Sequence, residues 1–120
     1  MITYWQQIHG KLVRVKKDEL NSELKTWVDA RAITPAEISE LEKEFQIESE
    51  HIVDILDPDE LSRIEQADGY ILVIMRLPIY DANTEIAYYT IPLGVIIKDN
   101  YIITICWTDC EVLRDFSANR

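Results

Sequence analysis

Alternating apolar and polar positions predict short strands in the first quarter of the chain. Ile2–Ile8 (ITYWQQI) and Lys11–Val15 (KLVRV) show the two-residue period of strands, and His9-Gly10 between them favours a turn. The polar stretch that follows favours a short helix over 18–24, and the apolar TWVD at 26–29 favours a brief buried strand. The expected order is therefore strand, strand, short helix and strand.

Two helices are expected next, each with its own boundary signal. Thr34 is a candidate N-cap, Pro35 suits the first helical position, and Glu37 three residues after the cap completes a capping box. Apolar residues then recur at helical spacing, at Ile38, Leu41 and Phe45. A second helix is expected over 49–56, and it ends before Pro58 because the residue preceding a proline is disfavoured in helical conformation.

The second half of the chain predicts an antiparallel series of strands after a loop at 57–61. The extended segments are expected at 62–65, 69–81, 86–98 and 101–107. Turn-rich residues at 81–85 and at Asp99-Asn100 separate the last three, and Pro92 and Gly94 predict a bulge or an edge position. Residues 109–116 have the pattern of the start of a helix. The order predicts one mixed α/β domain over residues 1–120, with a largely antiparallel sheet and helices packed on it.

The chain is strongly acidic, with 22 acidic and 12 basic residues and a formal net charge of -10. Nucleic acids and anionic membrane surfaces are bound through basic patches, so both are disfavoured as partners, and cations or basic partners are favoured. Between positions 48 and 68 eight acidic residues accompany a single strong base, Arg63. A solvated acidic face is the plain structural interpretation of that window.

Motifs for catalysis or for a closed metal site are missing from the sequence. There is no phosphate-binding glycine loop and no nucleophile elbow, so an enzyme is not expected. A calcium loop starting at Asp57 fails, because Ser62 stands where glycine is needed and Asp68 where glutamate is needed. Cys106 and Cys110 are expected to be reduced thiols rather than zinc ligands.

The remaining polar and aromatic residues have structural interpretations. His9 and His51 are expected at the surface or at caps rather than as ligands. Arg63 and Glu65, two positions apart on an extended segment, share one face and are interpreted as a structural ion pair. The three tryptophans are expected to be buried or half-buried packing residues, at Trp5, Trp27 and Trp107. No apolar run approaches the ~20 residues of a membrane helix.

Several short motifs occur in an order that resembles a known family. They are Trp27-Val28-Asp29, the helix start at Thr34-Pro35, Val53-Asp54-Ile55-Leu56, the pattern of Arg63 and Glu65 followed by Tyr70, and TIPLGVIIKDNYIITI at 90–105. Together these motifs span residues 26–108. In order and spacing they resemble the cytoplasmic amino-terminal domain of the CorA family of magnesium and divalent-metal transport proteins.

The resemblance implies a fold and a function. The fold is an α/β/α sandwich with helices on both faces of the sheet. The function is that of a regulatory, metal-sensing domain at the cytoplasmic face of the cell membrane, in a homopentameric transporter of magnesium or cobalt. The membrane helices and most of the stalk helix of such a protein lie outside this chain, so the membrane is expected as a partner only through that carboxy-terminal part. The alternatives are a free-standing soluble binding or regulatory domain and a domain of a zinc-transporting relative.

The resemblance also implies metal-binding residues. Asp54 occupies the position of the aspartate that helps hold a regulatory divalent ion between neighbouring subunits, and Asp57 is the second candidate. Magnesium suits such a site, because it prefers oxygen ligands, keeps several waters and is often held by one or two carboxylates. Val53 stands where many members of the family carry glutamate. Binding of Mg²⁺ to this domain by itself is expected to be weak.

Overall fold

The computed structural model of the chain describes residues 1–80, 88–108 and 113. Within that part seven strands form one sheet: β1 (Ile2–Ile8), β2 (Lys11–Val15), β3 (Thr26–Arg31), β4 (Arg63–Gln66), β5 (Ile71–Tyr80), β6 (Tyr88–Lys98) and β7 (Tyr101–Cys106). The 3₁₀ turn η1 (Lys17–Glu19) and the helices α1 (Pro35–Phe45) and α2 (Ser49–Leu56) complete the described elements. The prediction of a mixed fold with a largely antiparallel sheet is confirmed.

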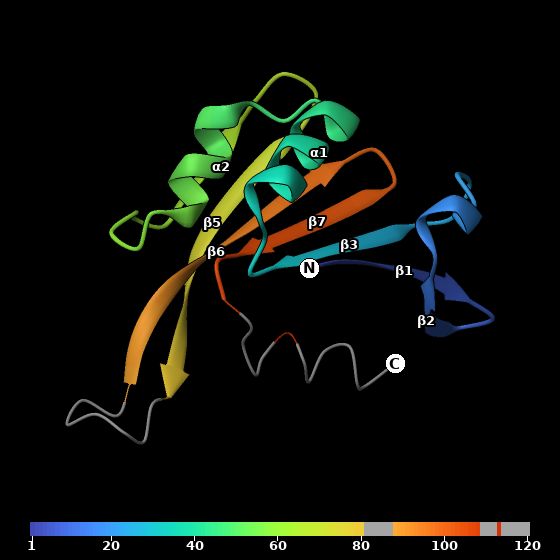
Figure 1. Cartoon of the computed structure of the whole chain (residues 1–120), viewed down its shortest axis with the longest axis horizontal. Helices are drawn as coiled ribbons and strands as arrows, with labels where there is room; N and C mark the ends of the chain where they lie inside the picture. The colour runs from blue at the N-terminus through green and yellow to red at the C-terminus, as the bar shows by residue number, and fades with distance from the viewer. Residues whose placement is uncertain (81–87, 109–112, 114–120) are drawn as a thin grey trace.

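The strand order is β2-β1-β3-β7-β6-β5-β4, so β3 from the first part of the chain lies beside β7, the last strand described, in the middle of the sheet (Figure 1). Neighbouring strands are antiparallel except for β3 and β7, which run parallel from Thr26 opposite Tyr101 to Arg31 opposite Cys106. A parallel pair needs a crossover connection. Here the chain between β3 and β7 supplies both helices and the β4–β5–β6 meander.

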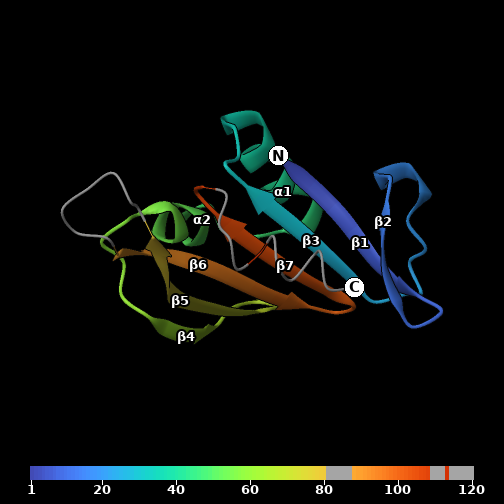
Figure 2. The ribbon, with the colours of Figure 1, turned by 90° about the horizontal axis from the view of Figure 1, so that it is seen from below.

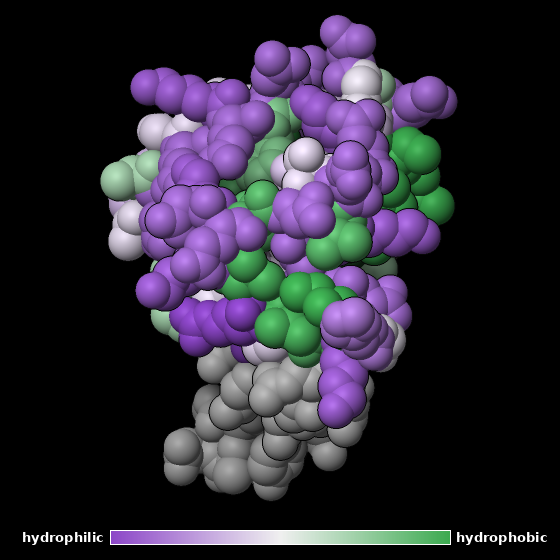
Figure 3. Space-filling view, turned by 90° about the vertical axis from the view of Figure 1, so that its right-hand side faces the viewer, coloured by the Kyte–Doolittle hydropathy of each residue, from purple (hydrophilic) through white to green (hydrophobic). Residues whose placement is uncertain are grey.

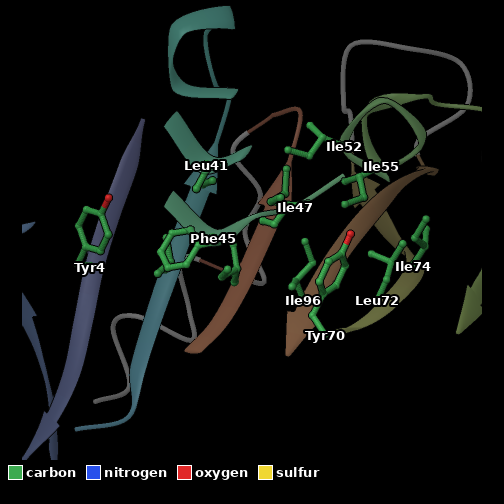
Figure 4. Packing of buried hydrophobic residues seen from close by; sticks show 14 residues of the cluster. Tyr4, Leu41, Phe45, Ile47, Ile52, Ile55, Tyr70, Leu72, Ile74 and Ile96 are labelled. Atoms are coloured by element: carbon green, nitrogen blue, oxygen red, sulfur yellow. The ribbon is translucent and has the colours of Figure 1, made fainter. Parts of the chain in front are cut away.

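Both described helices lie on the same face of the sheet (Figures 1 and 2). Side chains alternate between the faces of a strand, so one alternate set on each central strand packs against the helices. Figure 4 shows these residues from α1, α2 and the strands pointing toward one another. The core they form includes Tyr4, Leu41, Phe45, Ile47, Ile52, Ile55, Tyr70, Leu72, Ile74 and Ile96.

A second apolar cluster lies on the opposite face of the sheet. It contains Trp5, Trp27, Ile91, Leu93, Cys106 and Leu113. Trp5 and Trp27 stack with ring centroids 6.0 Å apart, and the Trp27 indole N–H donates to the Thr104 hydroxyl at 2.9 Å. These two tryptophans are buried as expected, whereas Trp107 keeps 41% of its surface exposed. Because both faces of the central strands are apolar, this sheet has the pattern of a middle layer.

The helix boundaries follow their local signals. The Thr34 hydroxyl accepts from the Glu37 N–H at 3.2 Å, and the Glu37 carboxylate accepts from the Thr34 N–H at 2.9 Å. The predicted capping box is therefore confirmed, with Pro35 in the first turn. Helix α2 ends at Leu56, two residues before Pro58, which confirms its predicted bounds.

Three expectations need correction or fall outside the description. The short helix expected over 18–24 is a 3₁₀ turn of only three residues. Of the two alternatives expected at Pro92 and Gly94, a bulge or an edge position, the bulge is absent, because β6 pairs with β5 without interruption. The edge position fits Pro92, which lies beyond the residues of β6 that pair with β7 and has no ladder partner on that side for its missing N–H. The turn at 81–85, Cys110 and nearly all of the helix start at 109–116 lie outside the described residues.

Candidate functional site at the end of helix α2

Helix α2 carries the predicted metal ligand Asp54 on its outward side. Ile52 and Ile55 on the other side are almost fully buried against the sheet. The helix comes unusually close to β6 because position 94 is glycine: a Cβ built on Gly94 would lie 2.3 Å from Ile55 Cδ1. The apolar side therefore fixes the height of α2 above the sheet, while Val53 and Asp54 remain accessible to solvent.

A buried polar contact holds the start of α2. The His51 ring is only 5% exposed, its Nδ1 lies 2.5 Å from the Tyr70 hydroxyl, and its Nε2 lies 2.7 Å from the Glu65 carboxylate. The same hydroxyl accepts from the Glu48 N–H at 3.1 Å. Burial is the main reason that the pKa of Tyr70 lies above its usual value. The expectation that His51 lies at the surface or at a cap is thus wrong: its buried ring joins α2 to Glu65 on β4 and to Tyr70 just before β5.

Asp54 is paired with a base of its own chain. Its Oδ2 accepts from Arg63 Nη2 at 2.8 Å, with 37% of the Asp54 side chain and 31% of the Arg63 side chain exposed. Arg63 also donates to the Glu60 carboxylate, and its Nη2 lies 3.9 Å from Glu65. The hydrogen bond to Asp54 is the main reason that the pKa of Arg63 is raised. The predicted Arg63–Glu65 pair is therefore the longest of three contacts made by one guanidinium.

Asp57, the second candidate, lies one helical turn after Asp54 and caps the end of α2. Its N–H donates to the Asp54 carbonyl at 3.2 Å, and its Oδ1 accepts from the Asp59 N–H at 2.9 Å. The final turn of α2 contains no base. Helix carbonyls give this end a partial negative charge, so two acids here are unfavourable unless a cation lies nearby.

The carboxylates at the end of α2 do not form a complete metal cage. No group of three or more histidine, cysteine, aspartate or glutamate side chains in the described part of the chain has the arrangement of a metal site. One carboxylate that is about one third exposed, with a second acid one helical turn later, suits a hydrated Mg²⁺, which needs few protein ligands. It does not suit a tight site supplied by this chain alone. A metal here needs further ligands from water or from another polypeptide.

A cavity and a buried cysteine lie away from the end of α2. A cavity of about 510 Å³ opens on the opposite face of the sheet, lined mainly by apolar surface around Trp27, Ile97, Ile102 and Leu113. The Cys106 thiol is buried, 3.9 Å from the Pro92 carbonyl oxygen. Throughout the described ranges, no helix combines the length and the apolar composition required to traverse a bilayer.

Comparison with known proteins identifies the family. Residues 23–119 match the family model described as CorA-like Mg²⁺ transporter protein. The cobalt/magnesium transport protein CorA of Methanocaldococcus jannaschii is 29% identical over 98 residues, which are 80% of this chain and 30% of that protein.

Solved structures agree on the fold. The complete CorA magnesium transporter of M. jannaschii superposes with a TM-score of 0.82 at 18% identity, over 99% of this chain and 36% of that one. The soluble domain of the same CorA gives 0.77 at 22% identity, over 100% of this chain and 47% of that one. The ZntB cytoplasmic domain of Vibrio parahaemolyticus superposes with a TM-score of 0.65 at 13% identity, over 98% of this chain and 49% of that one.

This chain spans a third to a half of the length of those relatives. The family is one of transporters rather than enzymes. The strand and helix order and the motifs around Asp54 thus have one explanation: the chain belongs to the family of CorA-like Mg²⁺ transporter proteins and has the fold of the CorA soluble domain.

Proposed function

We propose that this chain is the cytoplasmic, metal-sensing domain of a CorA-type divalent-cation transport protein. In this proposal Asp54, together with Asp57 one helical turn later, binds Mg²⁺ between neighbouring subunits of a homopentamer. Family membership supports the transport role. The observation that carries the sensing role is the position of Asp54: a carboxylate about one third exposed, on the outward side of a helix whose other side is fixed in the core.

The charge of the chain explains how such a domain responds to a cation. With a net charge of -10, neighbouring copies repel each other, and a divalent ion between two acidic surfaces reduces that repulsion. Loss of the ion would loosen the interface and shift the assembly toward a different arrangement. The acid that completes the site is expected on the stalk helix of the neighbouring subunit, outside the residues of this chain.

The proposal is tested in the full-length protein that contains this chain. Purified protein is titrated with Mg²⁺ and its assembly is followed by sedimentation, for the parent and for Asp54→Asn. Asp18→Asn is the matched control, since Asp18 is an exposed acid on η1, far from α2. We expect the parent and the control to tighten at millimolar Mg²⁺ and Asp54→Asn not to respond. Equal responses of all three proteins would refute the sensing role.

Uptake measurements separate the transport role from the alternatives. The same protein in liposomes containing a metal-sensitive dye should admit Mg²⁺ or Co²⁺. Uptake of Zn²⁺ in their place would assign the chain to a zinc-transporting relative. The ZntB cytoplasmic domain resembles this chain in fold. A protein that transports no cation would favour a free-standing binding or regulatory domain.

A further inference from the structure

The guanidinium of Arg63 lies where a cation would be expected to lie. It contacts carboxylates from three elements: Asp54 on α2, Glu60 in the loop after α2, and Glu65 on β4. No other strong base lies between positions 48 and 68 of this acidic chain. Arg63 therefore supplies the positive charge that the acidic end of α2 requires, without any metal.

The contact between Arg63 and Asp54 is suited to being exchanged. Both side chains are about one third exposed. Exposed ion pairs are worth only ~0–1 kcal/mol, since water and salt compete with them. A guanidinium bound to Asp54 Oδ2 also repels a divalent ion that approaches the same carboxylate. Arg63 at Asp54 therefore weakens metal binding by this carboxylate, and a bound metal weakens the contact with Arg63.

The loop beside Arg63 has a separate anchor. Arg76 Nη1 donates to the Glu60 carbonyl at 2.7 Å, while its Nε and Nη2 donate to Thr90. Glu60 is therefore held by its main chain whatever Arg63 does. If Arg63 leaves Asp54, it still has Glu60 and Glu65 within reach, so the exchange does not require the loop or β4 to unfold.

We propose that Arg63 is a built-in competitor of the divalent ion: it neutralises Asp54 when metal is scarce and moves to Glu60 and Glu65 when metal binds. This inference rests on the proposed function, because it assumes that Asp54 binds the ion. The inference adds that Arg63 sets the range of Mg²⁺ concentration over which the domain responds. Removal of the arginine charge should strengthen apparent Mg²⁺ binding by about two- to fivefold, the range that an exposed ion pair supports.

The test measures the Mg²⁺ concentration at half-maximal assembly of the full-length protein. The variants are Arg63→Gln and, in case it folds poorly, Arg63→Lys, which keeps the charge but loses the planar fork that pairs with carboxylates. Arg14→Gln is the matched control, because Arg14 is exposed on β2 at the other edge of the sheet. Figure 3 shows that end of the molecule, where hydrophilic residues cover much of the surface.

We expect Arg63→Gln to lower the midpoint about two- to fivefold, Arg63→Lys to lower it less, and Arg14→Gln to leave it within the experimental error. A midpoint that is unchanged or raised in Arg63→Gln would show that Arg63 shapes the site rather than competes for it. Equal shifts of the Mg²⁺ midpoint in Arg63→Gln and Arg14→Gln would show that the effect comes from the net charge of the protein and not from the position of Arg63. Both results overturn the inference while leaving the proposed function intact.

Failure of the proposed function gives a different result. If the proposed function is wrong, the parent shows no response to Mg²⁺, or Asp54→Asn responds like the parent. Either result overturns both proposals. If both hold, the double variant Arg63→Gln/Asp54→Asn behaves like Asp54→Asn alone, because without the carboxylate there is nothing for the arginine and the metal to compete for.

Discussion

Replacement of Gly94 by alanine tests whether β6 determines the position of α2. The added Cβ would lie 2.3, 2.5 and 2.8 Å from Cδ1, Cγ1 and Cγ2 of Ile55. Carbon atoms in ordinary contact are about 3.5–4.0 Å apart, so a gap of roughly 1 Å or more must open. Rotation of the Ile55 side chain does not clear all three atoms, because two of them are attached to its Cβ. The helix itself must move.

The size of the effect follows from two opposing terms. Overpacking a core costs about 1–3 kcal/mol, whereas the lower entropy of an alanine in the unfolded chain returns about 0.4–1 kcal/mol. We expect Gly94→Ala to lower the free energy of unfolding by about 1–2 kcal/mol, and the melting temperature by about 4–8 °C for a chain of this length. Urea unfolding followed by tryptophan fluorescence measures the first, and a thermal scan the second.

A second substitution makes the reasoning refutable. Ile55→Ala removes all three clashing atoms and leaves a cavity that costs about 2–5 kcal/mol. In that background alanine at position 94 fills part of the cavity, so Gly94→Ala should be neutral or stabilising. Gly10→Ala is the control, since Gly10 has φ 76° and open space around its Cβ position, so Ile55→Ala should not relieve its cost. Additive effects of Gly94→Ala and Ile55→Ala within ~0.5 kcal/mol would refute the proposed close contact.

Two further predictions concern the helix start and the buried histidine. The hydrogen bond from the Thr34 N–H is the main reason that the pKa of Glu37 is lowered. The charged carboxylate therefore stabilises the fold above the ordinary glutamate pKa, and this contribution is lost as the pH falls through the lowered value. Glu37→Gln should reduce the free energy of unfolding by about 0.5–1 kcal/mol at pH 7, and by much less near pH 3, as measured by urea unfolding. Tyr70→Phe removes the hydroxyl shared by His51 and the Glu48 N–H, and should destabilise by about 1–3 kcal/mol through the groups left unsatisfied, while Tyr101→Phe serves as the control.

The sequence predicts those parts of the fold that depend on neighbours along the chain. The capping box at Thr34 and the stop at Pro58 fix the two helices within a few residues, because each signal acts over one helical turn. The hairpin of β6 and β7 is equally local, since Asp99 takes a φ of 52° in the turn that joins them. These features were predictable without knowledge of the tertiary structure.

Contacts between distant segments were not predictable in this way. Nothing local indicates that β3 pairs with β7 in parallel, or that Gly94 is a contact point for Ile55 rather than a bulge. His51 precedes Ile52 and lies four residues before Ile55, so its place on the buried side of α2 could have been inferred from helical spacing. Its partner Tyr70 lies 19 residues away and could not.

The candidate site also combines features that the sequence predicts with contacts that it does not. Resemblance to the family selected Asp54 as a candidate, which stays a prediction, and simple spacing placed Arg63 and Glu65 on one face of a strand. The ion pair between Arg63 and Asp54 depends on how α2 lies against β4, which no pattern in either segment reveals. The sequence therefore offers a candidate carboxylate for a metal, and the structure is needed to see which groups of the chain that carboxylate contacts.

The two ends of α2 have different roles in this scheme. The start of the helix is fixed by His51 in a buried contact, and its middle by Ile55 against Gly94. The end carries Asp54, whose ion pair with Arg63 is exposed and weak. If Asp54 binds a cation as proposed, a strong anchor beside an exchangeable contact would let that cation change the charge at the helix end without moving the helix. A metal signal would then reach a neighbouring subunit through surface charge, so Gly94→Ala should weaken the Mg²⁺ response only as far as it displaces Asp54.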